Sequence, residues 1–291
     1  MAEPVRRVLS FGPTLCRAAL YAVLVGVYAV LPVWKEQMDK IAHVADVPPD
    51  LHAMLTLVLG CLLVFRTNTA YARWWEARKL WGALVNVSRN MAVKVADLVR
   101  ASDADLVKFR TEIVAFAYGL RDHLRREADI KKLDGFKDCV DSPKHVPAYI
   151  VTRMYEELGS WKKDAFIDGD ELRVLDEEAR RFLDICGGCE RIRNTLIARS
   201  YRTFARQCVF LYLLTLPWGI VNTFHSLTIP ITAIVAYFML GLEIVAEDVE
   251  EPFGRASDDL DLDGLCNAIE VSVHEIFGRR LDGENVQTDS A

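Results

Sequence analysis

The chain has 291 residues, 52% of them hydrophobic, and a mean hydropathy of +0.13, yet 26% of its residues are charged. It is more apolar than an ordinary soluble domain, but too highly charged to lie wholly in a membrane, so we expect one part in lipid and another in water. The net charge of −6 argues against a nucleic-acid partner, because no domain-wide basic excess is available to replace the counterions of a phosphate backbone.

Residues 1–65 are predicted to form an N-terminal segment and a first transmembrane hairpin. Arginines, Arg6 and Arg7 among them, precede an uncharged run from Ala18 to Trp34 that is long enough to cross a bilayer. This run exceeds the apolar region of a cleaved signal peptide, and no small-residue cleavage site directly follows it. A polar connection over Lys35–Asp50 leads to the apolar segment Leu51–Phe65, which is expected to return across the membrane.

Leu57, Cys61 and Phe65 recur at i, i+4 and i+8, which places them on one face of the second helix. In a single chain, such a stripe more often marks helix packing than the lining of a pore. Arg66 follows at once, and further arginines and three tryptophans, including Trp81, come within the next residues. Charges are costly at bilayer depth and tryptophan favours the interface, so the Phe65/Arg66 boundary predicts where the helix leaves the hydrocarbon.

Residues 66–206 are predicted to form a helical cytosolic domain, because they are highly charged and lack an apolar run long enough to span a bilayer. Asp105–Glu127 has apolar residues at helical spacing and is typical of an amphipathic helix. Asp129–Pro147 contains a glycine and two prolines and indicates a loop. Helix is expected over Ala148–Leu158, and again after Asp170 with a coiled-coil-like apolar seam.

Cys186-Gly-Gly-Cys189 is the one apparent chemical motif. A lone pair of this spacing could be redox-active or half of a zinc site, but no second cysteine pair or histidine pair completes a metal site. Both sulfurs fall on the apolar seam, so buried cysteines are favoured, with Gly187 and Gly188 permitting close approach of another helix. The seven cysteines do not form the pattern of a disulfide framework. No catalytic constellation is visible, and neither enzyme activity nor a cofactor is expected.

Residues 207–243 are predicted to form a second transmembrane hairpin. The uncharged tract Gln207–Leu242 is long enough for two spans, with a turn indicated around Pro217–Pro230. The turn has no lysine or arginine, whereas the opposite flanks are rich in arginine, which predicts that both termini and residues 66–206 are cytoplasmic. We therefore expect a multi-pass, all-α membrane protein with four transmembrane helices and a helical cytosolic domain.

Residues 244–291 form an acidic tail. Such a run is more often a solvated surface than a cation site, and Asp258 and Asp259 are weak cation-site candidates. Cys266–Phe277 is predicted to be a last helix, and Leu281–Ala291 a polar, disordered end.

Three sequence blocks resemble the bestrophin family, and more closely its bacterial branch. They are FRTNTAYARWWEARKLWG from Phe65, GGCERIRN from Gly187, and EDVEEPFG from Glu247 followed by DDLDLDGLCNAIE. The blocks occur in the order of the family and, with the preceding span, extend over most of the chain. The resemblance implies a homopentameric channel in the cell membrane, whose partners are small monovalent ions, the lipid bilayer and other copies of the chain.

The resemblance also assigns roles to residues. Leu57, Cys61 and Phe65 match the positions that line the hydrophobic neck of bestrophin channels, and Ile197 falls at a second constriction on the cytosolic side. Bacterial relatives usually have proline on both sides of that position, whereas Leu196 and Ala198 stand here. In animal members the acidic run after Pro-Phe-Gly helps to bind calcium, but residues 255–257 interrupt it here, which makes calcium regulation doubtful.

Three alternatives stay open from the sequence. Animal bestrophins conduct chloride and other small anions, while characterised bacterial members can favour monovalent cations, so membership of this chloride-channel family leaves the sign of the permeant ion undecided. A membrane sensor or scaffold would use the same helices without conducting. A thiol enzyme would depend on Cys186 and Cys189.

Overall fold

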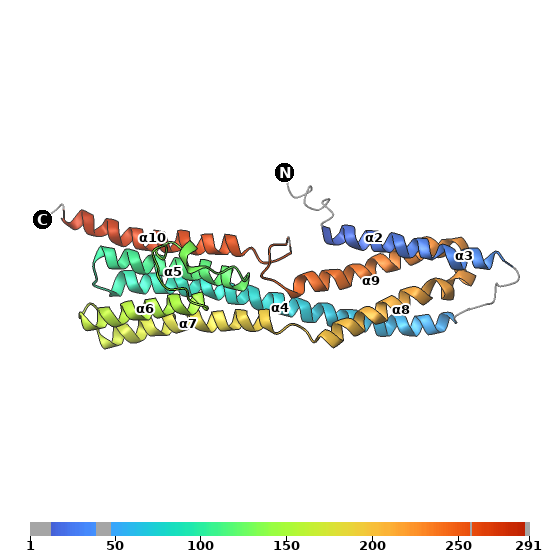
Figure 1. Cartoon of the computed structure of the whole chain (residues 1–291), viewed down its shortest axis with the longest axis horizontal. Helices are drawn as coiled ribbons and strands as arrows, with labels where there is room; N and C mark the ends of the chain where they lie inside the picture. The colour runs from blue at the N-terminus through green and yellow to red at the C-terminus, as the bar shows by residue number, and fades with distance from the viewer. Residues whose placement is uncertain (1–12, 39–47, 257, 289–291) are drawn as a thin grey trace. The chain divides into compact units, whose positions relative to one another are not determined.

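The computed structural model describes residues 13–38, 48–256 and 258–288, and its regular elements are α-helices with two short 3-10 helices (Figure 1). Arg6, Arg7 and most of the predicted connection over Lys35–Asp50 lie outside the described residues. The chain divides into two compact units. The apolar unit consists of Met1–Trp74, Leu196–Glu251 and Ala256–Asp258, and the charged unit consists of Trp75–Thr195, Pro252–Arg255 and Asp259–Ala291.

The apolar unit is a bundle of long helices. It contains α2 (Pro13–Tyr28), α3 (Val30–Glu36), the first part of α4 (Pro49–Leu98), α8 (Arg199–Phe224) and α9 (Thr228–Glu250). Small residues allow α2 to approach α9 closely: Ala18 and Ala22 are buried, and a Cβ atom on Gly26 would lie 3.1 Å from the Cβ of Ala233. Small residues four apart are a common means of packing helices in a membrane.

Among the described residues, three helical stretches are long and apolar enough to cross a membrane, namely Leu15–Glu36, Asp50–Leu98 and Arg199–Glu250. The third contains both α8 and α9, which are separated by the short helix η2 (His225–Leu227). At this break His225 has a positive φ of 48°. The predicted second hairpin therefore has its reversal at His225, within the turn expected from the sequence.

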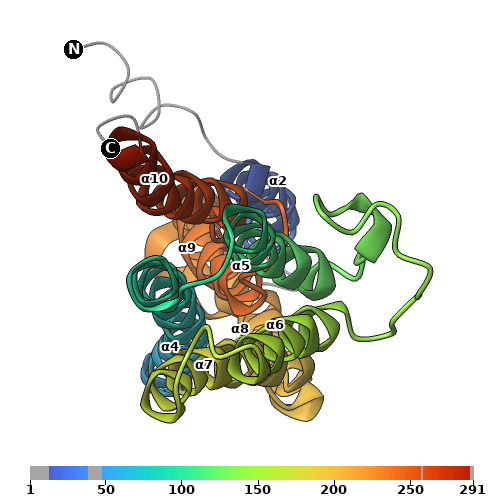
Figure 2. The same cartoon turned by 90° about the vertical axis from the view of Figure 1, so that its left-hand side faces the viewer.

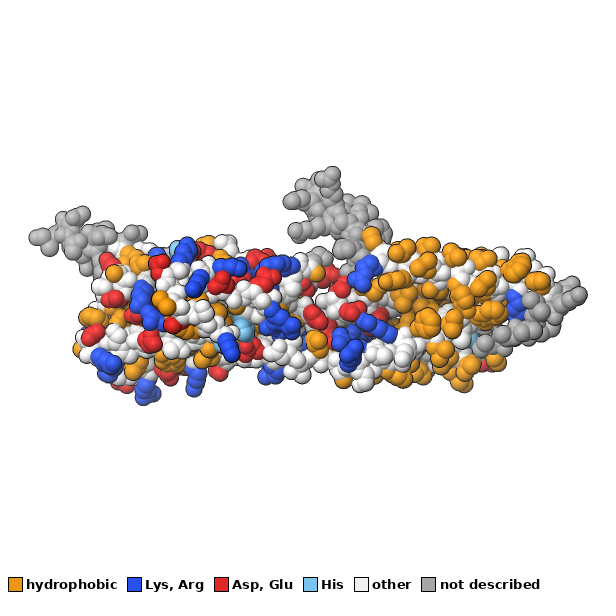
Figure 3. Space-filling view, viewed as in Figure 1, with side chains coloured by type: hydrophobic (Ala, Val, Ile, Leu, Met, Phe, Trp, Pro, Cys, Tyr) orange, Lys and Arg blue, Asp and Glu red, His pale blue; other side chains and the backbone are white. Residues whose placement is uncertain are grey.

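Apolar side chains also cover the surface of the apolar unit, as Figure 3 shows for one face. Leu24 of α2, Phe210 of α8 and Phe238 of α9 are each 58–69% exposed. An apolar surface of this extent is unfavourable in water and is typical of contact with lipid or with another protein surface.

The charged unit is a second helical bundle, seen end-on in Figure 2. It contains the rest of α4, α5 (Asp103–Leu124), α6 (Val146–Lys163), α7 (Gly169–Asn194) and α10 (Leu262–Thr288), with η1 (Ile130–Lys132) in the loop after α5. Asp168 and Glu171 form a reciprocal capping box that satisfies free backbone N–H groups at the start of α7. Aromatic side chains fill the core, where Phe116 and Phe182 meet edge to face.

Two expectations differ from the structure of this unit. Helix α10 continues to Thr288, so the predicted disordered end is helical for most of its length. The helix contains no proline, and an ion pair between Glu275 and Arg279, one turn apart, supports its exposed face. Trp81 was placed at a membrane interface, but it is fully buried in the charged unit, because α4 continues past the apolar unit and turns this side chain into the second core.

The cysteine motif is buried, as the sequence favoured. Cys186 and Cys189 are 1% and 0% exposed and are free thiols. Burial raises the pKa of Cys186 to about 12, so the reactive thiolate is disfavoured at neutral pH. Of the two glycines between them, Gly188 lies against Leu80 of α4, whereas Gly187 has open space around it.

This difference predicts that adding one methyl group has unequal effects at these two neighbouring positions. A Cβ atom at position 188 would lie 3.0 Å from the Leu80 methyl groups. A Cβ atom at position 187 would have no neighbouring atom within 4 Å. Gly187→Ala should raise the apparent melting temperature, because alanine favours helix by about 1 kcal/mol over glycine. Gly188→Ala should be less stable than Gly187→Ala in thermal melts followed by circular dichroism. Equal melting temperatures would contradict the close contact.

Candidate pore-lining stripe and buried charge cluster

Within the apolar unit, α4 has one covered face and one open face. Leu59 and Leu63 are each 4% exposed and lie in the apolar core with residues of α2, α8 and α9. Leu57 and Phe65 are 71% and 68% exposed, and Cys61 is exposed as well. The three residues predicted to form a neck therefore make one apolar stripe on the side of α4 that the chain itself leaves uncovered.

Arg66, directly after this stripe, is fully buried and is held by two carboxylates of α9. Its Nη1 atom lies 2.8 Å from Oε2 of Glu250, and its Nε atom lies 3.6 Å from Oε2 of Glu243. The exposed fractions of Glu250 and Glu243 are 0% and 5%. A buried guanidinium is tolerated only with such counter-charges, because desolvation of a single ion costs several kcal/mol.

The cluster corrects one expectation from the sequence and leaves another untested. That α4 leaves the hydrocarbon at the Phe65/Arg66 boundary stays a prediction. Glu250, in the predicted acidic tail, and Glu243, just before it, are buried rather than part of a solvated surface. The two carboxylates are seven residues apart, which is close to two helical turns, so they project from the same face of α9. That face is turned towards α4, and the contact joins residues 184 positions apart in the chain.

Glu250 also fixes the backbone at the second predicted constriction. Its Oε1 atom accepts the backbone N–H of Ile197 at 3.1 Å, while its Oε2 atom accepts from Arg66. The backbone oxygen of Glu250 accepts a further hydrogen bond from Nε of Arg73, at 3.3 Å. One buried carboxylate thus connects the end of the apolar stripe with the segment that precedes α8. Sequence reasoning missed Glu243 and Glu250, although carboxylates at helical spacing directly after a long uncharged tract were a usable signal.

Glu243 extends this cluster to α8. Nε of Arg206 lies 3.3 Å from Oε1 of Glu243, and Nη2 of Arg206 lies 2.7 Å from Oε1 of Glu247. Arg206 is half exposed, so its pairs are screened more strongly than the pair between Arg66 and Glu250. The buried ion pair between Arg66 and Glu250 is therefore the strongest electrostatic interaction of the cluster.

In the part of the chain that the structure describes, Asp258 and Asp259 do not belong to a group of ligand atoms close enough to hold a metal ion. The backbone oxygen of Asp258 accepts the indole N–H of Trp74 at 3.1 Å. Among the described residues, the group whose ligand atoms lie close enough to hold an ion is instead His123, His145 and Glu190. A cation role for Asp258 and Asp259 stays a prediction.

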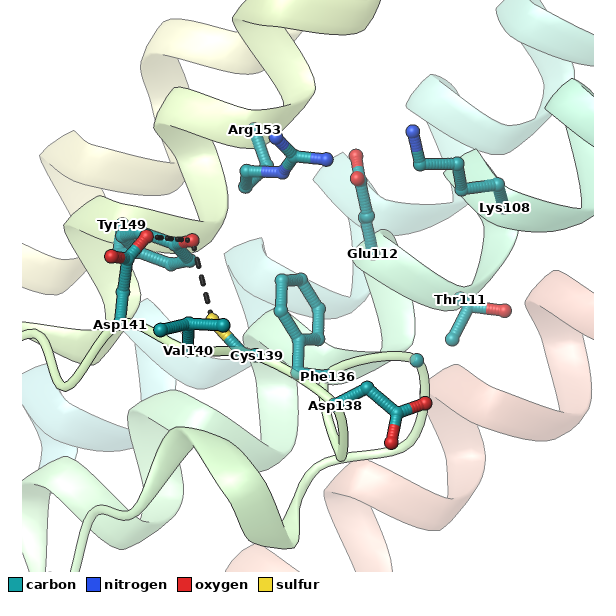
Figure 4. A pocket seen from close by; sticks show the side chains of 11 residues that line it. Lys108, Thr111, Glu112, Phe136, Asp138, Cys139, Val140, Asp141, Tyr149 and Arg153 are labelled. Atoms are coloured by element: carbon teal, nitrogen blue, oxygen red, sulfur yellow. Dashed lines mark hydrogen bonds between the residues drawn. The ribbon is translucent and has the colours of Figure 1, made fainter.

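A separate cavity of about 480 Å³ lies in the charged unit, beside Glu112 of α5 (Figure 4). Glu112 is 3% exposed, and Figure 4 shows its carboxyl group between the side chains of Lys108 and Arg153. Burial, together with the nearby Glu157, raises the pKa of Glu112 to about 8, although Lys108 and Arg153 oppose the shift. Glu112 is thus mostly protonated at neutral pH.

Residues 9–275 match the family described as Bacterial/Fungal Bestrophin protein. The chain belongs to the bestrophin family. It is 34% identical over 256 residues to the Voltage-dependent anion channel-forming protein sll1024 of Synechocystis sp., covering 82% of this chain and 81% of that protein. It is 35% identical over 229 residues to the Voltage-dependent anion channel-forming protein mll4386 of Mesorhizobium japonicum, covering 77% and 74%.

The bestrophin fold is also found in a solved structure. The crystal structure of a bacterial bestrophin homologue from Klebsiella pneumoniae is similar with a TM-score of 0.78 at 23% identity, covering 90% of this chain and 98% of that chain. The resemblance inferred from the three sequence blocks is therefore confirmed at the level of the family and the fold.

The buried charge cluster predicts a large difference between two adjacent glutamates. Glu250→Ala leaves Arg66 buried without its nearest counter-charge and frees the Ile197 N–H, so we expect a loss of about 3–5 kcal/mol in unfolding free energy. Glu251→Ala, at an exposed position, should cost less than about 0.5 kcal/mol. Thermal or denaturant unfolding of the detergent-solubilised protein measures both. If the two variants unfold alike, the carboxylate of Glu250 does not stabilise the fold.

Glu112 predicts a pH dependence of stability. A carboxyl group whose pKa is higher in the folded than in the unfolded state binds its proton more tightly when folded, so its contribution to stability falls as the pH rises from about 4.5 to about 8. Glu112→Gln removes this contribution, and its melting temperature should change less between these pH values than that of the wild type. Glu177→Gln, at a half-exposed position, is the control and should retain the wild-type slope. A Glu112→Gln protein with an unchanged slope would contradict the raised pKa.

Proposed function

We propose that this bestrophin is a passive channel for small monovalent ions, with chloride and other small anions as its preferred class. The observation that carries the proposal is the uncovered apolar stripe of Leu57, Cys61 and Phe65, which ends at the buried Arg66. The channel-forming names of relatives at 34% and 35% identity support conduction, and those names specify anions. A monovalent-cation-selective channel is the second candidate, because an apolar stripe carries no charge that selects a sign.

The pore of this channel lies on the symmetry axis of an oligomer. One chain does not enclose a pore, and identical chains close around an axis most readily with cyclic symmetry. The bestrophin resemblance makes a homopentamer the expected assembly. Each subunit crosses the membrane with four helices, and both termini and residues 66–206 face the cytoplasm.

The stripe forms the neck of the pore. Cyclic symmetry repeats Leu57, Cys61 and Phe65 as stacked rings, and a narrow apolar constriction of this kind hinders ions by losing its water. The ring of Phe65 side chains is the bulkiest of the three, and it lies next to Arg66. Selectivity is then determined outside the neck, where arginine-rich and acidic segments border the path.

Ile197 forms the second constriction on the cytosolic side. Its position depends on Glu250, because the carboxylate that accepts the Ile197 N–H also binds Arg66 beside Phe65. Leu196 and Ala198 leave the backbone less restricted than the flanking prolines of other bacterial members would. Glu250 is therefore a positioning residue for this constriction, and it makes no direct contact with the permeant ion.

The neck assignment predicts that Phe65→Ala combined with Cys61→Ala widens and hydrates two rings at once. The single-channel conductance in planar bilayers should rise severalfold. Phe210→Ala removes the same kind of side chain, at a comparable exposure of 69%, from α8 and outside the stripe, and should leave the conductance unchanged. If the double variant conducts like the wild type, the neck assignment is wrong, whichever ion permeates.

The sign of the permeant ion is tested by reversal potentials. With a NaCl gradient across a bilayer containing purified protein, an anion-selective channel shifts the reversal potential towards the chloride equilibrium potential. Replacing chloride by gluconate on one side should then abolish most of the current in one direction. A shift towards the sodium equilibrium potential establishes the cation-selective alternative. Ion flux no greater than that of empty liposomes would instead favour a non-conducting sensor or scaffold.

A further inference from the structure

Three side chains with metal-binding groups converge in the charged unit. His123 lies in the last turn of α5, His145 is the N-cap residue of α6, and Glu190 lies near the end of α7. Oε1 of Glu190 is 2.6 Å from Nε2 of His123 and 3.0 Å from Nε2 of His145. The two imidazole ring centroids are 4.7 Å apart. These residues come from three separate segments of the chain, whose helices group together in Figure 2.

The cluster is accessible from solvent. The side chains of His123, Glu190 and His145 are 17%, 27% and 42% exposed. An ion could therefore enter with a water molecule completing its coordination. Nη1 of Arg193 donates to the backbone oxygen of His123 at 2.9 Å, which holds this end of α5 in place without occupying the Glu190 carboxylate.

The donor set favours one class of ion. Two imidazole nitrogens and one carboxylate oxygen suit zinc and similar transition-metal ions, whereas calcium and magnesium prefer oxygen ligands throughout. Zinc binds these groups at about 2.0–2.2 Å, so ligand atoms now at hydrogen-bond distance need to separate by less than about 1 Å. The three protein ligands would occupy three positions of a tetrahedral site, and a water molecule would occupy the fourth.

In the structure, the same groups form hydrogen bonds with one another and with the backbone. Nδ1 of His145 accepts the backbone N–H of Ala148 at 3.1 Å, so its neutral ring carries the proton on Nε2 and donates it to Glu190. Coordination through Nε2 moves that proton to Nδ1 and breaks the cap on α6, which costs about 1 kcal/mol. Metal binding should therefore expose the Ala148 amide.

We propose that His123, His145 and Glu190 form a binding site for a zinc-class divalent cation, which links the end of α5, the start of α6 and the end of α7. Sequence reasoning did not find this site, because the ligands are 22 and 45 residues apart and lie on no common motif. Its ligands all lie in the charged unit, and none of them belongs to the proposed neck.

The test is equilibrium dialysis of the full-length protein in detergent, first stripped with EDTA and then exposed to micromolar zinc chloride, with bound zinc measured by atomic emission. We expect one zinc ion per chain and a higher melting temperature with zinc. His123→Gln and Glu190→Gln should each weaken binding at least tenfold, since loss of even an outer-shell partner typically costs 10–100-fold. His274→Gln, at an exposed position of the same unit, should bind like the wild type.

Two further measurements keep the test decisive if a ligand variant does not fold. Cobalt binding by the wild type should give the visible absorption bands of a tetrahedral site, and hydrogen exchange at Ala148 should become faster with zinc. Wild-type protein that retains no zinc, or retains it equally after His123→Gln, overturns the proposal and leaves a metal-free hydrogen-bonded cluster. Displacement of zinc by equimolar calcium would overturn the assignment of the ion class.

Discussion

The apolar unit depends on the burial of one positive charge. Arg66 is fully buried within a bundle of mainly apolar helices, and the carboxylates of Glu243 and Glu250 make this tolerable. Because an unpaired buried charge is so unfavourable, the cluster specifies which face of α9 is turned towards α4. The apolar packing of Leu59 and Leu63 could tolerate small rotations, whereas an ion pair of 2.8 Å restricts them.

The carboxylate of Glu250 connects the charge cluster to both proposed constrictions. Glu250 binds the side chain that follows Phe65 and the backbone N–H of Ile197, so the two proposed constrictions share one buried group. A movement of α9 that displaced Glu250 would therefore disturb both. Arg206 attaches α8 to the same cluster through Glu243, at a half-exposed position where solvent can modulate the pair.

The charged unit is built on different chemistry. Its core contains aromatic side chains and buried thiols. Burial raises the pKa of Glu112, one of its buried carboxyl groups, and nearby cations oppose that shift. The His123, His145 and Glu190 cluster lies at the ends of three of its helices, where an ion would link elements that are otherwise held by side-chain packing and hydrogen bonds. The pH dependence expected from Glu112 and the metal dependence that we propose both arise from residues of the charged unit.

Much of this protein is determined by short-range patterns in its sequence. Apolar periodicity predicts α5 and the long α7, the spacing of Leu57, Cys61 and Phe65 predicts one helical face, and the Arg-Trp-Trp and Pro-Phe-Gly blocks indicate the bestrophin family. These signals are readable because each depends on residues within a few helical turns. The burial of Arg66, its pairing with Glu250, the core position of Trp81 and the meeting of two histidines with Glu190 were decided only by tertiary structure. Whether a charge is solvated or buried depends on which helix faces it, and helix packing brought together Arg66 and Glu250, which are 184 positions apart.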